Sequence, residues 1–318
     1  MKKLALLLLA LAIVIPAFAD DAKVLPAGVL RTYLLLAQSS YDETYDDDGD
    51  TVDAAFGGVS AWSTGIALEY GVTDQITAAL QWTPAWIFSS SFGDPINLGA
   101  GPNDDGNVNG LEDLFIGAKV QIVGKNGFVV NDAMRFAAAA GIKIPLAQYD
   151  AQDEQDAYIA GDEFTFSPTS KQALGYGFRL YYDYLVTDSF WINLYNETIF
   201  YAPVEKDSIL APGTDVEYEY GYDLTLEVEP HYDYKVDNTL TLSAALPFTY
   251  TKMPESEEDG VGQDDESNLL TLGPNVSAFW TGGPLPMELE VGYALPLMGK
   301  NNPASKTFTV IFKSYMKF

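Results

Sequence analysis

The sequence predicts an all-β protein, a closed antiparallel transmembrane β-barrel of about twelve strands. Three observations lead to this fold class. Segments of roughly ten or more residues alternate between apolar and polar positions, and they are joined in turn by very short turns and by long acidic loops. No window beyond the N-terminal region reaches the roughly eighteen consecutive apolar residues of a membrane helix, although 47% of the residues are hydrophobic and 13% are aromatic. A helical membrane protein is therefore excluded.

The N-terminal residues have the pattern of a secretory signal. Lys2 and Lys3 precede an apolar run from Leu4 to Ile15, and Ala-Phe-Ala closes it as a small-residue cleavage site. The run is too short for a membrane helix, which needs about twenty residues. We therefore expect residues 1–19 to be removed and residues 20–318 to form a single barrel domain.

The composition excludes several classes of function. The chain carries 45 acidic and 17 basic residues, a formal net charge of −28. We expect no nucleic-acid partner, because neutralising phosphates requires an excess of lysine and arginine. Cysteine is absent, so an exported chain of this sequence must take its stability from strand pairing rather than from disulfides.

Strands follow from the period-two alternation and from the residues that favour tight turns. A barrel with an even number of strands has both termini on the periplasmic side, with short turns there and long acidic loops outside. A soluble β-sandwich would show no such asymmetry, and its strands would be shorter. We expect the strands near 28–38, 60–72, 75–87, 111–123, 132–146, 172–186, 190–202, 216–235, 239–252, 268–280, 285–298 and 306–318.

The segment 216–235 shows the clearest alternation. Tyrosines and aliphatic residues occupy one face, while Asp223, Glu227, Glu229 and Asp233 lie on the other, with further acids nearer the outer mouth. Slipping the strand by one residue would turn these acids toward lipid, where a charge at the bilayer midplane costs up to roughly 2–4 kcal/mol. The register is therefore strongly specified, and the acidic face is predicted to line the lumen.

The same alternation predicts the other residues of the lumen. They include basic residues on strands opposite the acidic one, so we expect an acidic wall facing a more basic wall. A barrel of about twelve strands is wider than an eight-stranded barrel that side chains fill and narrower than a general porin. These features indicate a narrow, acid-lined, cation-preferring channel for passive uptake of small solutes; the alternative is a structural or surface-interaction barrel without a conducting pore. The predicted pore-lining residues beyond segment 216–235 are Arg135, Lys143, Arg179, Asp183, Glu288 and Glu290.

The C-terminus carries a pattern of its own. Phe318 ends the chain, and Met316, Phe312 and Val310 precede it on the same face of the last predicted strand. This pattern resembles the C-terminal signal that the outer-membrane barrel assembly machinery recognises. The resemblance implies an outer membrane of a diderm bacterium, with its lipids and the assembly machinery as partners.

A second resemblance covers about a quarter of the chain. It rests on Leu68–Asp74 (LEYGVTD), on Gly110–Asp113 (GLED) with Gly117–Lys119 (GAK), and on Ala140–Pro145 (AGIKIP). These segments resemble outer-membrane transporters of aromatic-compound (meta-pathway phenol) degradation, which are distantly similar to long-chain fatty-acid transporters. The resemblance implies diffusion of small, often apolar molecules. It departs from the fatty-acid transporters in having only a short segment, instead of a long plug, before the first strand.

Two acidic loops have spacings related to calcium-binding loops. In the first, glutamates replace the usual first two aspartates, and in the second, which includes Glu112, a glycine stands at the first ligand position. A weak calcium site is one hypothesis, and solvated acidic loops are the other; no further cofactor is expected. The candidate ligands of the first loop are Glu255, Glu257, Asp259 and Glu266.

His231 is the only histidine, and it stands between Glu229 and Asp233 on the predicted lumen face. Outer-membrane enzymes of similar architecture build catalysis around a histidine, but this one is predicted near the short-turn end, away from the outer leaflet where such enzymes act. The chain also has no nucleophile elbow and no phosphate-binding glycine loop. We therefore expect no enzyme, and we interpret His231 as a solvated lumen residue.

Overall fold

The computed structural model describes residues 21–54, 57–92, 107–146, 170–208 and 211–318. The predicted signal segment and much of two predicted long loops lie outside these ranges. In the described part the regular elements are all strands. No helix among these residues is long and apolar enough to cross a membrane.

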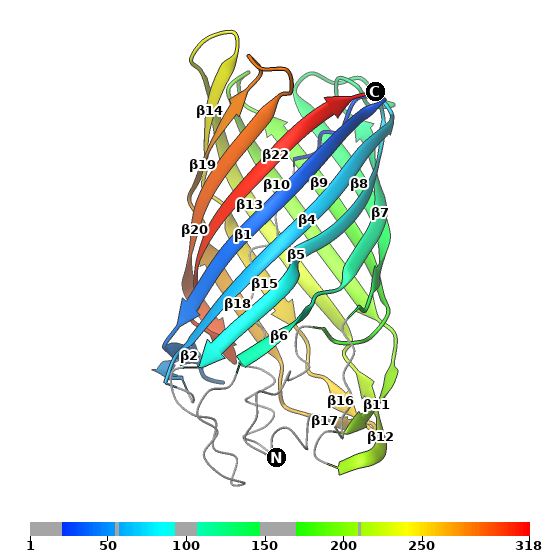
Figure 1. The fold of residues 1–318 in the computed structure, drawn as a ribbon, viewed down its shortest axis with the longest axis vertical. Helices are drawn as coiled ribbons and strands as arrows, with labels where there is room; N and C mark the ends of the chain where they lie inside the picture. Colours follow the sequence, from blue (N-terminus) through cyan, green and yellow to red (C-terminus); the bar gives the residue numbers. More distant parts are fainter. Residues whose placement is uncertain (1–20, 55–56, 93–106, 147–169, 209–210) are drawn as a thin grey trace.

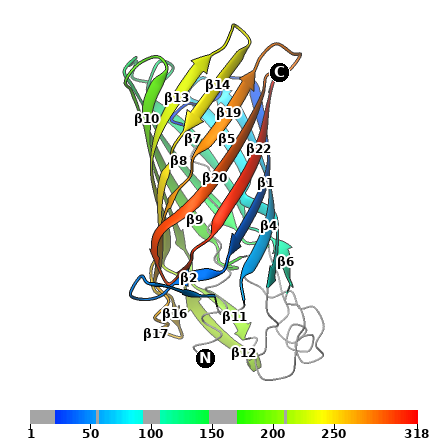
Figure 2. The same ribbon diagram turned by 90° about the vertical axis from the view of Figure 1, so that its left-hand side faces the viewer.

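The strands close into one antiparallel barrel (Figures 1 and 2). The sheet path contains fourteen strands, and β14–β15 and β18–β19 each share one position in the wall, which leaves the predicted twelve positions. Pairing of β1 with β22 and of β10 with β13 closes the ring. The strands of the wall are β1 (Val29–Tyr41), β4 (Val59–Thr73), β5 (Ile76–Phe92), β7 (Leu114–Val123), β8 (Met134–Ile144), β9 (Gly175–Leu185), β10 (Phe190–Tyr201), β13 (Tyr222–Lys235), β14 (Leu240–Ala245), β15 (Phe248–Met253), β18 (Ser267–Leu272), β19 (Asn275–Trp280), β20 (Met287–Lys300) and β22 (Lys306–Lys317).

Two of the twelve positions are interrupted at proline. Pro247 separates β14 from β15, and Pro274 separates β18 from β19. Proline cannot donate a ladder hydrogen bond, so a strand breaks or bulges where it occurs. The chain bridges one gap through the amide of Gly273, which donates to the carbonyl of Pro247 at 2.9 Å. The predicted strands 239–252 and 268–280 are thus present in two pieces each.

The prediction of one continuous strand over 216–235 was wrong in one respect, because the strand breaks at Gly221. This glycine has a positive φ of 65°, and a Cβ there would lie 2.9 Å from Pro254 Cγ. The chain before the break leaves the barrel wall and joins a small sheet, which carries Glu217 and Glu219. This sheet consists of β11 (Val204–Ser208), β12 (Ala211–Glu219), β16 (Glu257–Glu258) and β17 (Val261–Gly262).

The two ends of the barrel differ, as the sequence predicts. The small sheet and a second one lie at the end opposite the C-terminus, where β6 (Asn107–Leu111) pairs with the last residues of β5 (Figure 1). At the C-terminal end the connections are short, as between Leu185 and Phe190. The second small sheet consists of β2 (Glu43–Tyr45), β3 (Thr51–Asp53) and β21 (Asn302–Pro303).

Exposure separates the outside of the wall from the inside. On β13, Leu226 and Val228 are 42% and 46% exposed, whereas Glu227 between them is 5% exposed. The exposed face is apolar, which suits contact with hydrocarbon, and the acids face inward. On β1, where three leucines run together, Leu35 is the inward one at 5% exposure and Leu36 is turned outward at 44%.

Candidate functional site

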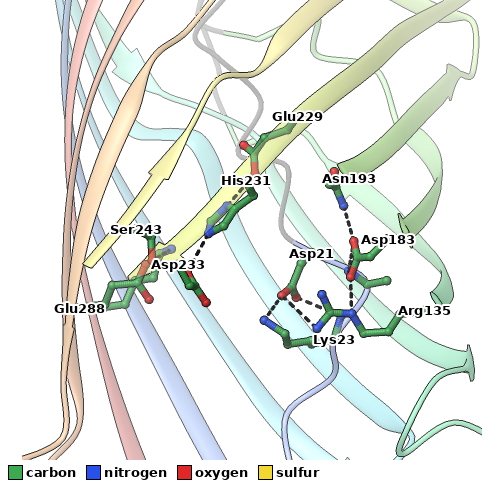
Figure 3. A network of polar contacts seen from close by, with 12 residues as sticks. Asp21, Lys23, Arg135, Asp183, Asn193, Glu229, His231, Asp233, Ser243 and Glu288 are labelled. Carbon is green, nitrogen blue, oxygen red and sulfur yellow. Dashed lines mark hydrogen bonds and ion pairs between the residues drawn. The ribbon is translucent and has the colours of Figure 1, made fainter. Parts of the chain in front are cut away.

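A buried ion pair holds β8 to β9 inside the barrel. Arg135 Nε lies 2.6 Å from Asp183 Oδ2, and Asn193 Nδ2 donates to Asp183 Oδ1 at 2.7 Å. Asp183 is fully buried, so its charge depends on these partners rather than on water. Figure 3 shows this group on the inner face of the wall.

A chain of polar contacts continues across the lumen. Arg179 on β9 pairs with Glu197 on β10 and donates from Nη1 to Gln81 Oε1 on β5 at 2.6 Å. Gln81 Nε2 donates to Glu69 Oε1 at 2.9 Å, and Arg31 Nε donates to Glu69 Oε2 at 2.9 Å. Since β7 and β8 lie between β5 and β9 in the sheet, the contact from Arg179 to Gln81 spans two strands.

Three glycines make room for this span. Gly117, Gly141 and Gly177 face one another on β7, β8 and β9, and a Cβ on any of them would come within 2.5–2.7 Å of the Phe115 ring. The ring therefore lies flat over the glycines, and the Arg179 guanidinium sits 4.0 Å from its centroid. Cation–π contact of this kind orients the guanidinium.

A second charged group lies nearer the small sheets. Lys143 Nζ is 3.3 Å from Asp113 Oδ2 and donates to the Tyr201 hydroxyl at 3.2 Å. Tyr201 in turn donates to Asp223 Oδ2 at 2.6 Å, and Lys171 pairs with the same carboxylate. Asp223 is therefore compensated within the protein.

Residues 21–27, here named the inner segment, line part of the lumen before β1 begins. The amide of Ala22 donates to Asp183 at 3.2 Å, and the amide of Leu25 donates to Thr77 Oγ1 at 2.8 Å. Ala22 is fully buried in a cluster with Ala137, Tyr181 and Tyr195 on the wall. The sequence predicts only a short lead into the first strand, and its position in the lumen follows from tertiary contacts.

The inner face from β13 to β20, here named the acidic wall, has a different composition. His231 lies 3.2 Å from both Glu229 and Asp233 through its two ring nitrogens (Figure 3), and it stacks on Trp191 at 4.0 Å between centroids. Ser243 donates to Asp233 at 2.6 Å.

At the far edge of the acidic wall, Lys313 of β22 bridges two glutamates of β20. Its Nζ lies 3.1 Å from Glu288 and 3.0 Å from Glu290. The strands between β13 and β20 place mostly short hydroxyl and amide residues opposite these acids, among them Thr249 beside Glu227 and Ser277 beside Glu290.

All ten predicted pore-lining residues lie on the inner face, but they fall into separate groups. The opposite wall is not simply basic, because each of its arginines and Lys143 faces a carboxylate. Three of those carboxylates, Glu69, Asp113 and Glu197, were missed by the sequence reasoning. The period-two alternation of β4 and β10 places Glu69 and Glu197 on the inward face, so the sequence pattern could have predicted these two.

The acidic loop with calcium-loop spacing makes other contacts. Glu255 Oε1 accepts from the amide of Asp264 at 2.8 Å, and Asp259 Oδ1 accepts from the amide of Glu217 at 3.0 Å. Glu266 pairs with Lys300, and this hydrogen bond lowers the pKa of the glutamate. Among the described residues no group of three or more acidic, histidine or cysteine side chains could hold a metal ion.

The C-terminal pattern lies on the outside of the barrel. Phe318, Met316 and Phe312 are 75%, 41% and 37% exposed, and β22 pairs with β1 from Lys317 onward. The amide of Phe318 donates to the carbonyl of Gly28 at 2.9 Å. The last strand thus joins the first at the edge where the ring closes.

No protein-family model and no curated protein matches this chain. Its fold is similar to the COG4313 outer membrane channel from Pseudomonas putida F1, with a TM-score of 0.65 and 16% identity over 95% of this chain and 100% of that one. The match to the beta domain of the Bordetella autotransporter Brka has a TM-score of 0.47, 9% identity, and coverage of 92% and 100%. A Pseudomonas aeruginosa FadL homologue matches with a TM-score of 0.42 and 11% identity, over 91% of this chain and 90% of that one. The first of these similarities extends over 95% of this chain and all of the other, and it shows that they share the barrel fold.

Proposed function

We propose that the protein is an outer-membrane channel for passive diffusion of small solutes, with a narrow and predominantly acidic lumen. The observation that carries this proposal is the closed ring with an apolar exterior and a charged interior, as on β13, where Leu226 and Val228 face out and Glu227 faces in. Burying charged side chains on the inner face costs free energy on folding, and a water-filled passage is a structure in which such side chains serve a function.

The charge distribution supports a preference for cations. On the wall from β1 to β10 the cations are largely matched by acids. Besides Asp223, which pairs with Lys171, the acidic wall holds five carboxylates, at positions 227, 229, 233, 288 and 290, and the cations paired with them are Lys313 and His231. A passage lined by one sign of charge concentrates counter-ions, and the effect weakens once salt shortens the Debye length below about 8 Å.

The class of solute follows from the same lining. Lysine and arginine groups lie over aromatic rings at several places, for example Lys171 over Tyr201 at 4.3 Å and Lys119 over Tyr181 at 4.7 Å. Solutes that combine a polar or charged group with a small apolar or aromatic body suit such a lining, because both halves find partners. We include small aromatic compounds in this class.

Recordings of the purified protein in planar bilayers test the proposal. We expect discrete current steps and, in a salt gradient at about 0.1 M, a reversal potential that indicates cation preference. Replacing three acids together, Asp223→Asn, Glu227→Gln and Glu229→Gln, should reduce this preference. An anion-preferring wild type, or a triple variant with an unchanged reversal potential, would contradict the acidic-lumen proposal.

The second candidate function is a structural or surface-interaction barrel. It is favoured by the extra sheet formed by β11, β12, β16 and β17 at one mouth, which offers a folded surface beyond the wall. A barrel of confirmed fold that stays electrically silent in the bilayer would favour this candidate over the channel.

A further inference from the structure

We propose that Glu227 is a binding subsite for the ammonium group of a small organic cation, with Glu229 and Glu290 as its electrostatic neighbours. The inference deepens the proposed channel function by naming the chemical class that the lumen binds, and it rests on that function only for how the cation reaches the lumen. It begins from the hydrogen-bonding state of Glu227.

Glu227 is only partly satisfied. Thr249 donates to its Oε2 at 2.6 Å, while Oε1 is buried without a hydrogen-bond partner among the described residues. The residue is 5% exposed. A buried carboxylate oxygen that lacks a donor costs more than an ordinary unpaired polar atom, because it has lost its water without replacement.

The other lumen acids of β13 and β20 show what kind of partner is missing. Asp223 has Lys171, and Glu229 shares His231 with Asp233. In the described part of the chain Glu227 is the one inner acid of these two strands with no cationic side chain against it. Its two electrostatic neighbours, Glu229 and Glu290, are both acids, and each already faces a cation, His231 and Lys313 respectively.

The acidic wall also contains an internal example of how it binds an ammonium group. Lys313 Nζ lies between Glu288 and Glu290 at 3.1 and 3.0 Å, and the hydroxyl of Tyr315 also donates to Glu288 at 3.1 Å. Two carboxylates of the same face thus hold one ammonium without metal-like coordination. Glu227 repeats the acid without the lysine, whereas its neighbours Glu229 and Glu290 already face His231 and Lys313.

The surrounding wall leaves the subsite suited to an ammonium rather than to a metal ion. Calcium needs about six to eight oxygen ligands at roughly 2.3–2.6 Å, and among the described residues no group of three or more acidic, histidine or cysteine side chains is placed to hold a metal ion. An ammonium needs only one short charge-assisted hydrogen bond and a negative potential. The residue paired with Glu227 across the β13–β15 ladder is Thr249, whose short side chain places no charge beside it.

Two cations of equal charge test the proposal in a bilayer: n-butylammonium, which donates hydrogen bonds, and tetramethylammonium, which cannot. We expect n-butylammonium to reduce the single-channel current saturably, and tetramethylammonium to act much more weakly. A hydrogen bond to a charged group contributes about 1.5–3 kcal/mol, so Glu227→Gln should raise the half-blocking concentration of n-butylammonium by about tenfold or more. Equal action by both cations would show a general charge effect and overturn the proposal.

Two variants sharpen the result. Thr249→Lys supplies an ammonium group beside Glu227, as Lys313 does beside Glu288, and should abolish block while every acid remains. Glu217→Gln removes the same charge from the small sheet outside the wall and should leave block unchanged. If Glu217→Gln weakens block as much as Glu227→Gln does, the subsite assignment is wrong.

Calorimetric titration of the detergent-solubilised barrel with n-butylammonium separates this inference from the channel proposal. A barrel that conducts but neither binds n-butylammonium nor is blocked by it refutes the subsite alone. A silent barrel that binds it, and loses that binding with Glu227→Gln, keeps the subsite and refutes the channel. The heat-modifiable gel band of each variant shows whether the barrel has folded.

Discussion

Removing the charge of Asp183 should destabilise the barrel strongly, because Asp183 is the buried partner of Arg135. In Asp183→Asn the shape is kept, but the guanidinium, whose side chain is 12% exposed, loses its carboxylate. Breaking a buried pair in this way costs about 3–5 kcal/mol. Asp21 lies 4.0 Å from the same guanidinium and offsets part of the loss, so we expect about 3 kcal/mol.

The assay is urea unfolding of the detergent-solubilised protein, followed by tryptophan fluorescence. The matched control is Asp132→Asn, which removes an exposed charge from the connection between β7 and β8 and should change the unfolding free energy by less than about 0.5 kcal/mol. Combining Asp183→Asn with Arg135→Gln should recover stability, giving a coupling of about 2 kcal/mol. A loss below about 1 kcal/mol for Asp183→Asn, or strict additivity in the double variant, would refute the reasoning.

Three further predictions concern assembly, the inner segment and pH. Deleting Phe318 should lower the yield of heat-modifiable barrel in outer-membrane fractions, because the exposed terminal aromatic is lost from the closing strand; undiminished yield would contradict this. Gly71→Ala places a Cβ 2.0 Å from the carbonyl oxygen of Pro26, so it should displace the inner segment. Maleimide labelling of a Val24→Cys probe should then be about tenfold faster, which corresponds to a free-energy difference of about 1.4 kcal/mol. An unchanged labelling rate would show that the segment stays in place. Burial lowers the pKa of Lys206 in the small sheet to about 8. Between about pH 8 and the ordinary lysine pKa of about 10.4, the unfolded hairpin therefore binds more protons than the folded one. Local stability should therefore rise with pH across that window; proteolysis of β11–β12 should slow as pH increases, and Lys206→Met should remove the trend.

The buried charges of the lumen have a consequence for function. An ion pair that is enclosed by protein often stabilises a fold no more than packed hydrophobic residues would. The network from Arg31 to Glu197 is therefore better understood as fixing the shape and polarity of the passage. Its members are held by glycines and by Phe115, which leave each charged group few alternative positions.

The period-two alternation of the sequence by itself determined the barrel class, the number of strands and the inward face of β13. This was possible because alternation is a local property, and because turning acids such as Glu227 and Glu229 toward lipid is prohibitively costly. The alternation did not predict where a strand breaks. The alternation runs unbroken through Gly221, yet the strand breaks there: Gly221 has a positive φ, and a Cβ at this position would meet Pro254, which is distant in the sequence.

Only the tertiary structure decided which charges meet. Whether Arg179 reaches Gln81 depends on how far the strands are staggered, and whether Glu227 has a cation beside it depends on what Thr249 contributes across the ladder. The position of the inner segment against Asp183 likewise follows from contacts between residues 161 positions apart in the chain. These relations depend on pairing and on the closure of the ring, and no short window of sequence contains them. The sequence therefore predicts the inward-facing residues, while their compensation, and with it the one uncompensated acid of β13 and β20 in the described chain, is set by the closed barrel.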